Sequence, residues 1–178
     1  MLSFNFDPFP NLTTHRLNLR SFQEEDVKSL FETRAYPKNS IYLDRTPYQK
    51  IKEAEDFFHK ITTGVRQNKW INWAITLKGN SKMVGSICLW NLNAEKAIGE
   101  LGYEMHPDFQ GKGIMTESMK KVIEYGFTTM QLQKIEAATH QDNKASIKVL
   151  EKFNFKYEKN LEGDEKYLAI YGWITDNG

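Results

Sequence analysis

The chain has 178 residues, of which 40% are hydrophobic and 26% are charged, a balance typical of a globular protein rather than a disordered or membrane-spanning one. The formal net charge of +1 gives no general attraction to nucleic acid or to an anionic membrane, so neither is an expected partner. The single cysteine, Cys88, excludes an intrachain disulfide and a cysteine-based metal cluster, and no metal site is predicted.

The sequence gives no sign of export or membrane insertion. Its N-terminus lacks a basic segment followed by an apolar run and a small-residue cleavage site. No uncharged apolar stretch approaches the roughly 20 residues of a membrane helix. We therefore expect a cytoplasmic protein that forms a single domain over residues 1–178, a length that suits one hydrophobic core.

A strand and two helices are expected first. Alternating leucines indicate a strand over Arg16–Phe22. Acidic residues up to Asp26 favour the start of a helix, which Tyr36-Pro37 ends. Apolar residues at spacings of three and four then predict an amphipathic helix over Ile51–Arg66.

Three strands follow these helices. The segments Trp70–Leu77 and Met83–Leu92 are rich in aromatic and β-branched residues, and Lys78–Ser81 between them has the composition of a turn. An antiparallel hairpin is therefore expected. Ala97–Met105 is the third strand, and Met83–Leu92 carries apolar residues at both parities, which indicates a strand covered on both faces.

The C-terminal part is predicted to alternate between helices and strands. An apolar stripe that starts after Gly113 and runs to Met130 predicts a helix, and Lys134–Thr139 follows as a strand. Asp142 or Asn143 is the expected N-cap of the next helix.

Two closing strands complete the predicted order. Phe155–Leu161 and Tyr167–Ile174 read as a hairpin whose turn is Glu162–Glu165. The whole order, with strands and helices interleaved, predicts an α/β fold in which helices cover the faces of a mixed sheet.

The loop HPDFQGKGIMTES carries the main chemical signal of the sequence. Gly111 and Gly113 permit backbone conformations that a Cβ would block, and the helix that follows presents unpaired N–H groups at its start. Backbone N–H groups from about Gly111 to Thr116, with Lys112 at the rim, would suit a phosphate or pyrophosphate. A plain turn before a helix needs the same residues, and the spacing fits neither a P-loop nor a dinucleotide fingerprint.

The segments around this loop resemble the GNAT acetyltransferase superfamily, and its RimJ/RimL branch in particular. The resemblance rests on Gly102–Pro107, on Asn143–Ser146 with Glu151–Phe155, and on the N-terminal Phe9–Leu17, and it runs from about Leu12 to Ile174. It implies a predominantly antiparallel sheet of six to seven strands flanked by helices. It also implies an enzyme that transfers an acetyl group from acetyl-CoA directly to a primary amine.

The resemblance also implies which residues bind acetyl-CoA. The family's Gln/Arg-x-x-Gly-x-Gly/Ala pattern, which binds the pyrophosphate, falls on Gln110–Met115, although Met115 stands where the pattern has a small residue. Asn143 would contact the pantetheine arm, with a simple helix cap as the alternative. Backbone N–H groups in a splayed strand would polarise the thioester carbonyl. The residues assigned to acetyl-CoA are Tyr103, Glu104, Met105, Gln110, Gly111, Lys112, Gly113, Ile114, Met115, Thr116, Asn143 and Ser146.

Two catalytic residues are expected on the same grounds. Glu100 matches a position where several GNAT enzymes carry a catalytic base, and a solvated glutamate is the alternative. Many members place an acidic tyrosine where this chain has Leu150, but the RimJ/RimL branch has a serine at Ser146, which would donate a proton to the thiolate. Cys88 is interpreted as a core residue rather than a nucleophile, and His140 as a surface residue.

The acceptor is expected to be the N-terminal α-amine of a protein or peptide. An α-amine titrates near 7.7–8.0 and a lysine amine near 10.4, so the former is more often neutral at pH 7. The alternatives are a polyamine or aminoglycoside acceptor, a non-catalytic acyl-CoA sensor, and an unrelated phosphate binder. Ile51–Arg66 and the Glu162–Glu165 turn are expected to border the acceptor groove, and a homodimer is possible.

Overall fold

The computed structural model describes residues 2–43, 45–162 and 167–174. Within these residues, four α-helices and eight strands are present, together with three short 3-10 turns. The helices are α1 (Val27–Ala35), α2 (Ile51–Arg66), α3 (Ile114–Thr128) and α4 (Lys144–Lys152). The strands are β1 (Leu12–Thr13), β2 (Leu17–Arg20), β3 (Ile71–Leu77), β4 (Met83–Asn93), β5 (Ile98–Met105), β6 (Lys134–His140), β7 (Lys156–Asn160) and β8 (Leu168–Ile174).

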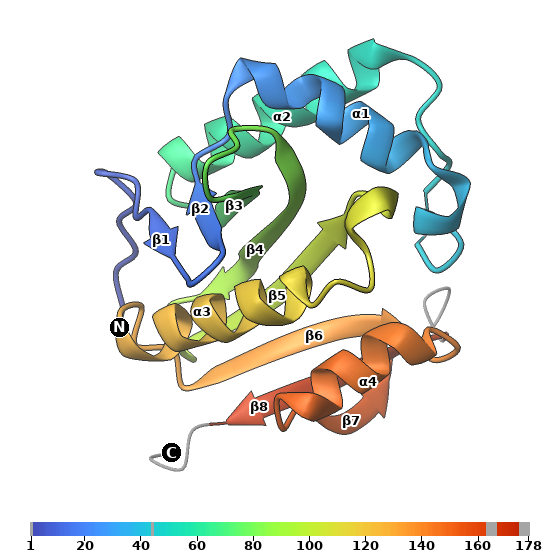
Figure 1. Ribbon diagram of the computed structural model, residues 1–178. Helices are drawn as coiled ribbons and strands as arrows, with labels where there is room; N and C mark the ends of the chain where they lie inside the picture. Colours follow the sequence, from blue (N-terminus) through green and yellow to red (C-terminus); the bar gives the residue numbers. More distant parts are fainter. Residues whose placement is uncertain (1, 44, 163–166, 175–178) are drawn as a thin grey trace.

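All described strands belong to one sheet with the order β1-β2-β3-β4-β5-β6-β8-β7. Every neighbouring pair is antiparallel except β5 and β6, which run parallel. A parallel pair needs a long crossover connection, and α3 supplies it between β5 and β6 (Figure 1). The predicted α/β fold with a predominantly antiparallel sheet is confirmed.

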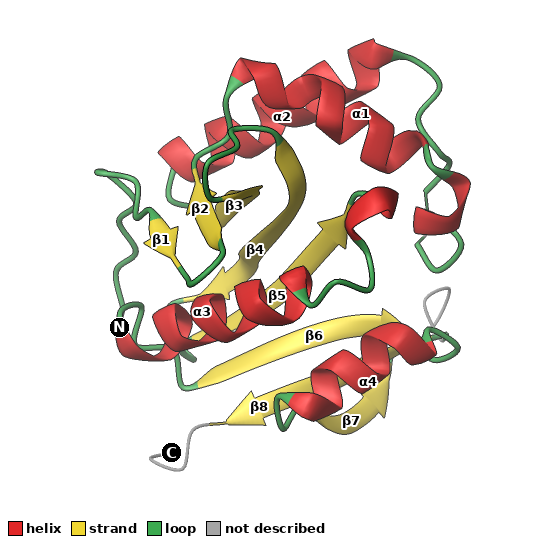
Figure 2. Cartoon of the chain, viewed as in Figure 1, coloured by secondary structure: helices red, strands yellow, loops and turns green. Residues whose placement is uncertain are grey.

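Helices cover both faces of this sheet (Figure 2). The larger core joins α3 and α4 to one face, where Trp73 of β3 and Leu101 of β5 are buried. The smaller core joins α1 and α2 to the other face, where Ala74 of β3 is buried between Leu30 and Phe58. Trp73 and Ala74 are adjacent in sequence, so the period-two alternation of a strand sends them to opposite layers.

The element boundaries lie close to those expected, with two differences. The sheet has eight strands rather than six to seven, because the two-residue strand β1 pairs with β2. A strand of two residues has no periodicity for sequence analysis to detect. Asn143, rather than Asp142, caps α4 with its side chain. Residues 163–166, which include most of the turn expected at the acceptor groove, lie outside the described residues.

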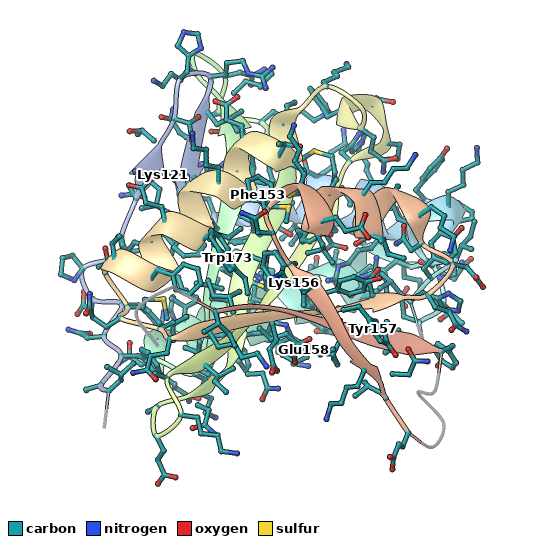
Figure 3. The ribbon with its side chains drawn as sticks, turned by 90° about the horizontal axis from the view of Figure 1, so that it is seen from below. Lys121, Phe153, Lys156, Tyr157, Glu158 and Trp173 are labelled. Carbon is teal, nitrogen blue, oxygen red and sulfur yellow. The ribbon has the colours of Figure 1, made fainter. Side chains whose placement is uncertain are left out.

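One edge of the sheet is more exposed than the rest. All five residues of β7 are exposed, and Figure 3 shows Lys156, Tyr157 and Glu158 along this outermost strand. The ion pair of Glu158 with Lys134, at 2.7 Å, ties β7 to β6 across β8.

Among the described residues, no helix is long and apolar enough to cross a membrane.

The strands β5 and β6 separate soon after they meet. Their pairing covers only Ile98, Gly99 and Glu100 of β5, whereas β5 continues to Met105 and β6 to His140. Figure 1 shows the two strands diverging beyond this point. The divergence divides the sheet into two halves and interrupts its hydrogen-bond ladder at the C-terminal end of β5, and we call this break in the pairing the opening.

Candidate active site

A glycine-rich loop at the start of α3 lies beside this opening. Gly111 and Gly113 adopt φ angles of +71° and +73°, which non-glycine residues rarely do. Gly113 is the N-cap of α3, so the N–H groups of Ile114, Met115 and Thr116 have no acceptor within the helix. These N–H groups, at the positive end of the helix dipole, form a cradle that suits an anion.

The cradle is fastened to the N-terminal hairpin through Glu117. This carboxylate accepts hydrogen bonds from Thr14 Oγ1 at 2.5 Å and from the backbone and side chain of Arg16 at 2.9 and 2.6 Å. Arg16 also donates to the carbonyl of Lys112 at 3.2 Å. Burial of Glu117 opposes its charged form, but the hydrogen bonds from Thr14 and Arg16 outweigh it and lower the pKa to about 2.

A second brace holds the other end of the loop. Gln110 Nε2 donates to Asn39 Oδ1 at 2.9 Å and to the carbonyl of Met105 at 3.1 Å. Asn39 Nδ2 donates to the same carbonyl at 3.1 Å and to the Thr33 carbonyl at 2.9 Å. The side chain of Gln110 therefore fixes the loop to β5 and to the α1–α2 connection, while the backbone of the loop remains available.

The backbone of β5 turns polar groups toward the opening. His106 N–H donates to Val84 O at 2.9 Å, so the even-numbered residues of β5 pair with β4. Polar groups alternate in direction along a strand, so Tyr103 and Met105 present theirs on the β6 side. The backbone of Glu104 lies on the β4 side, so Glu104 does not share this orientation. The opening thus offers strand-edge hydrogen bonds to an extended ligand.

Ser146 lies in the first turn of α4 and contacts β5 across the opening. The Ser146 and Tyr103 hydroxyl oxygens are 2.6 Å apart and hydrogen-bonded. Asn143 Oδ1 accepts from the Ser146 backbone N–H at 3.2 Å, which confirms the helix-cap role of Asn143 and fixes Ser146 in place. Burial raises the pKa of Tyr103 above its usual value, with the Ser146 hydrogen bond acting in the opposite sense.

Glu100 lies at the point where β5 and β6 part, on the opposite face from Tyr103. Its register partners are Trp90 on β4 and Glu136 on β6. Asn91 Nδ2 donates to Glu100 Oε2 at 3.3 Å. Parity along β5 places Glu100 on the α1–α2 side of the sheet, because Glu104 on the same parity contacts α1. The candidate base and Ser146 are thus separated by the thickness of the sheet.

Glu104 is held by two arginines. Its carboxylate binds Arg34 Nε at 2.7 Å and a guanidinium nitrogen of Arg45 at 3.1 Å. The guanidinium of Arg34 also stacks on Phe57, 3.3 Å from the ring centroid. Both carboxylate oxygens of Glu104 are therefore engaged by guanidinium groups.

The structure also shows the environment of three other residues from the sequence analysis, Cys88, Leu150 and His140. Burial raises the pKa of the Cys88 thiol to about 12, which removes the thiolate needed for nucleophilic attack. Leu150 is 1% exposed and belongs to the larger core. His140 contacts the rings of Tyr42 and Tyr167, and its Nδ1 accepts from the Asp142 backbone N–H at 3.1 Å.

The fold and this site together define an acetyltransferase of the GNAT class. Residues 16–156 match the family model for the acetyltransferase (GNAT) domain, a match that extends over most of the chain. The protein belongs to the GNAT family, in its RimJ/RimL-like branch, and is a GNAT-family N-acetyltransferase. The resemblance found in the sequence is confirmed.

Relatives and solved structures agree with this assignment. The chain is 30% identical over 155 residues to the N-acetyltransferase p20 of Bacillus licheniformis, covering 87% of each chain. It is 23% identical over 149 residues to the spermidine N(1)-acetyltransferase of Escherichia coli K12, covering 84% of this chain and 77% of that one. The structure of the ribosomal-protein α-N-acetyltransferase RimL in complex with coenzyme A is similar to this one, with a TM-score of 0.81 and 20% sequence identity. The match covers 95% of this chain and 100% of that chain.

Several residues of the site were not found in the sequence. Arg16 and Thr14 brace the cradle, and Asn39 braces its entry, yet each is far along the chain from the residue it binds. No local pattern marks such contacts. The hydroxyl of Tyr103 was also missed, since the resemblance gave that residue only a backbone role. The signal that could have found it is that a tyrosine stands at a position of β5 whose side chain points to the face covered by α4.

We expect Glu117→Gln to destabilise the protein by on the order of 2 kcal/mol at pH 7, because a charged acceptor is lost. The folded pKa of about 2 lies below the ordinary 4.5, so the stabilisation is fully present above about pH 5 and disappears as the pH falls toward 2. Urea unfolding of both proteins at pH 7, 5, 4 and 3 measures the difference in unfolding free energy.

The matched control for this experiment is Glu124→Gln, on the same helix. Glu124 is exposed, and among the described residues its carboxylate pairs with Lys121 alone, at 3.1 Å, so its loss should change the free energy of unfolding by less than about 0.5 kcal/mol. A destabilisation by Glu117→Gln that did not change with pH would show that the carboxylate charge is not responsible.

Proposed function

We propose that the protein transfers the acetyl group of acetyl-CoA to the N-terminal α-amine of a protein or peptide. The observation that carries the proposal is the opening between β5 and β6. It has an anion cradle at one end, and Glu100 and Ser146 lie on opposite faces of the sheet beside it. Such an arrangement lets a donor and an acceptor meet from two sides.

The donor part of the proposal rests on the fit of the cradle and the opening. The N–H groups from Gly111 to Thr116 suit a pyrophosphate, with Lys112 exposed at the rim. The pantetheine arm carries amides, which match the strand-edge groups of Tyr103 and the backbone N–H of Met105. Met115, which departs from the family pattern, is partly buried against the larger core and so lies against the protein interior.

The chemistry follows from the placement of the side chains. An acyl thioester is already activated, so an amine can attack it directly if a base removes the amine proton and an acid protonates the sulfur. Glu100 is the proposed base, on the α1–α2 side. Ser146 is the proposed donor to sulfur, on the α4 side. The backbone N–H of Tyr103 is aimed at the opening, where it would stabilise a developing oxyanion.

The acceptor part of the proposal rests on the limited capacity of the side chains at the site to deprotonate an amine. Glu104 is bound by Arg34 and Arg45, which leaves Glu100 as the other glutamate of this parity on β5. An acceptor that is partly neutral at pH 7 suits such a site, and an α-amine meets that condition better than a polyamine. The relatives include both ribosomal-protein and spermidine acetyltransferases, and a polyamine acceptor is therefore the second candidate.

The donor site can be tested by binding alone. We expect Gly111→Ala to weaken binding of coenzyme A about tenfold, because a Cβ would crowd the cradle and disfavour a left-handed backbone. Isothermal titration with coenzyme A measures this. Gly79→Ala is the matched control, since Gly79 has φ +79° in the β3–β4 turn and, like Gly111, has no atom within 4 Å of an added Cβ.

Both substitutions should cost a similar stability, on the order of 1 kcal/mol, but only the change at Gly111 should weaken the binding of coenzyme A. Equal effects of the two substitutions on affinity would contradict the cradle.

The acceptor class can be tested by release of free thiol from acetyl-CoA. The panel contains a lysine-containing peptide with a free N-terminus, the same peptide with its N-terminus blocked, spermidine and an aminoglycoside, each with the no-acceptor rate subtracted. We expect turnover with the free peptide and little with the blocked one. Turnover with spermidine alone would establish the second candidate instead. Tight binding of coenzyme A with no release in any arm would overturn the proposal and favour a sensor.

The role of Glu100 has its own pH signature. We expect Glu100→Gln to lower kcat/KM by about 100-fold or more near pH 7. The loss should shrink as the pH rises above the acceptor's own pKa, because a neutral amine needs no base. The measurement is a kcat/KM profile between pH 6 and 10. Glu95→Gln, at an exposed turn position, is the control, and parallel profiles for wild type and Glu100→Gln would argue against a base.

A further inference from the structure

The proposed donor to sulfur, Ser146, has a chemical difficulty. An aliphatic hydroxyl holds its proton more tightly than a thiol, whose ordinary pKa is about 8.5. Transfer of the Ser146 proton to a departing thiolate would leave an alkoxide, which is unfavourable unless another group returns a proton to the serine at once. A serine in this position therefore needs a proton-donating partner.

The structure provides such a partner in Tyr103. Its hydroxyl oxygen lies 2.6 Å from Ser146 Oγ, within the range of a strong O–H···O bond. Tyr103 comes from β5 and Ser146 from α4, so the bond joins the two sides of the opening. Asn143 fixes the backbone of Ser146 by accepting its N–H in the N-cap hydrogen bond of 3.2 Å.

We propose that Tyr103 supplies Ser146 with the proton that Ser146 gives to the leaving sulfur. This inference rests on the proposed function. As the amine nitrogen bonds to the carbonyl carbon and the C–S bond breaks, the electron pair of that bond stays on sulfur. Sulfur takes the proton of Ser146, and Ser146 takes the proton of Tyr103. Solvent then returns to Tyr103 the proton that the amine released, so protons and charge balance.

Other nearby side chains do not fit this role. Leu150, one turn along α4 from Ser146, is buried and apolar. His140 uses Nδ1 to accept from the Asp142 backbone N–H, and its ring stacks on Tyr167 and contacts Tyr42 at a tilt. The phenol of Tyr103 is a stronger acid than an aliphatic hydroxyl and already contacts the serine. The side chain of Tyr103 has a positioning role, since the hydroxyl acts on the substrate only through Ser146.

The test combines kinetics with a double-mutant cycle. Tyr103→Phe keeps the ring and removes the hydroxyl. We expect it to lower kcat at least about tenfold, with the KM for acetyl-CoA and the Kd for coenzyme A within about twofold of wild type. Ser146→Ala should have a similar effect, and the double variant should be no worse than the poorer single one, because both act in one chain. Additive losses would show that the two residues act separately.

Tyr125→Phe is the matched control for this variant. Tyr125 is a partly buried tyrosine of α3 whose ring packs edge-on against Trp73 at 5.4 Å. Its hydroxyl has no hydrogen bond among the described residues, so kcat should stay at the wild-type value. A wild-type kcat for Tyr103→Phe, with a loss for Ser146→Ala, would overturn the relay and leave the proposed function standing.

A second measurement needs no acceptor. If Ser146 and Tyr103 donate toward sulfur, they stabilise the bound thiolate of coenzyme A, and affinity should rise above about pH 8 relative to desulfo-coenzyme A. Tyr103→Phe and Ser146→Ala should each reduce this rise. A rise that persists in Tyr103→Phe overturns the relay whatever the acceptor. Absence of turnover in the wild type with this rise present would count against the proposed function and not against the hydrogen-bonded chain.

Discussion

The parting of β5 from β6 is the constraint on which the rest of this structure depends. A parallel pair that stays together would satisfy its own backbone groups and leave no room for a ligand. Here the pairing ends at Glu100, and the polar groups of the next residues of β5 face an opening. Burial of such groups is costly unless they form hydrogen bonds. An extended substrate in the opening would supply the partners for these bonds.

An opening in a sheet is stable only if its margins are held by other means. One margin is held by the bond between Tyr103 and Ser146. The cradle is held by Glu117, which joins α3 to the N-terminal hairpin. The paired cores on the two faces keep the helices in place while the strands diverge. The margins of the opening are thus held by hydrogen bonds and by core packing rather than by strand pairing.

Sequence analysis gave the elements more accurately than the contacts between them. The helix Ile51–Arg66 was predicted at both ends because its apolar stripe is strongly periodic, and the loop before α3 was recognised because its positive φ angles favour glycine. The brace from Thr14 to Glu117 joins residues 103 positions apart, and nothing local encodes that distance. Likewise the ion pairs of Glu104 become visible only when α1 and the Arg45 segment meet β5.

The carbonyl of Met105 carries a further consequence. It accepts from both Asn39 and Gln110, so one oxygen joins the connection between α1 and α2 to the entry of the glycine loop. A shift of either segment must strain the same pair of hydrogen bonds. The positions of the α1–α2 connection and of the glycine loop are therefore set by one shared acceptor, and neither segment can move without changing the hydrogen bonding of the other.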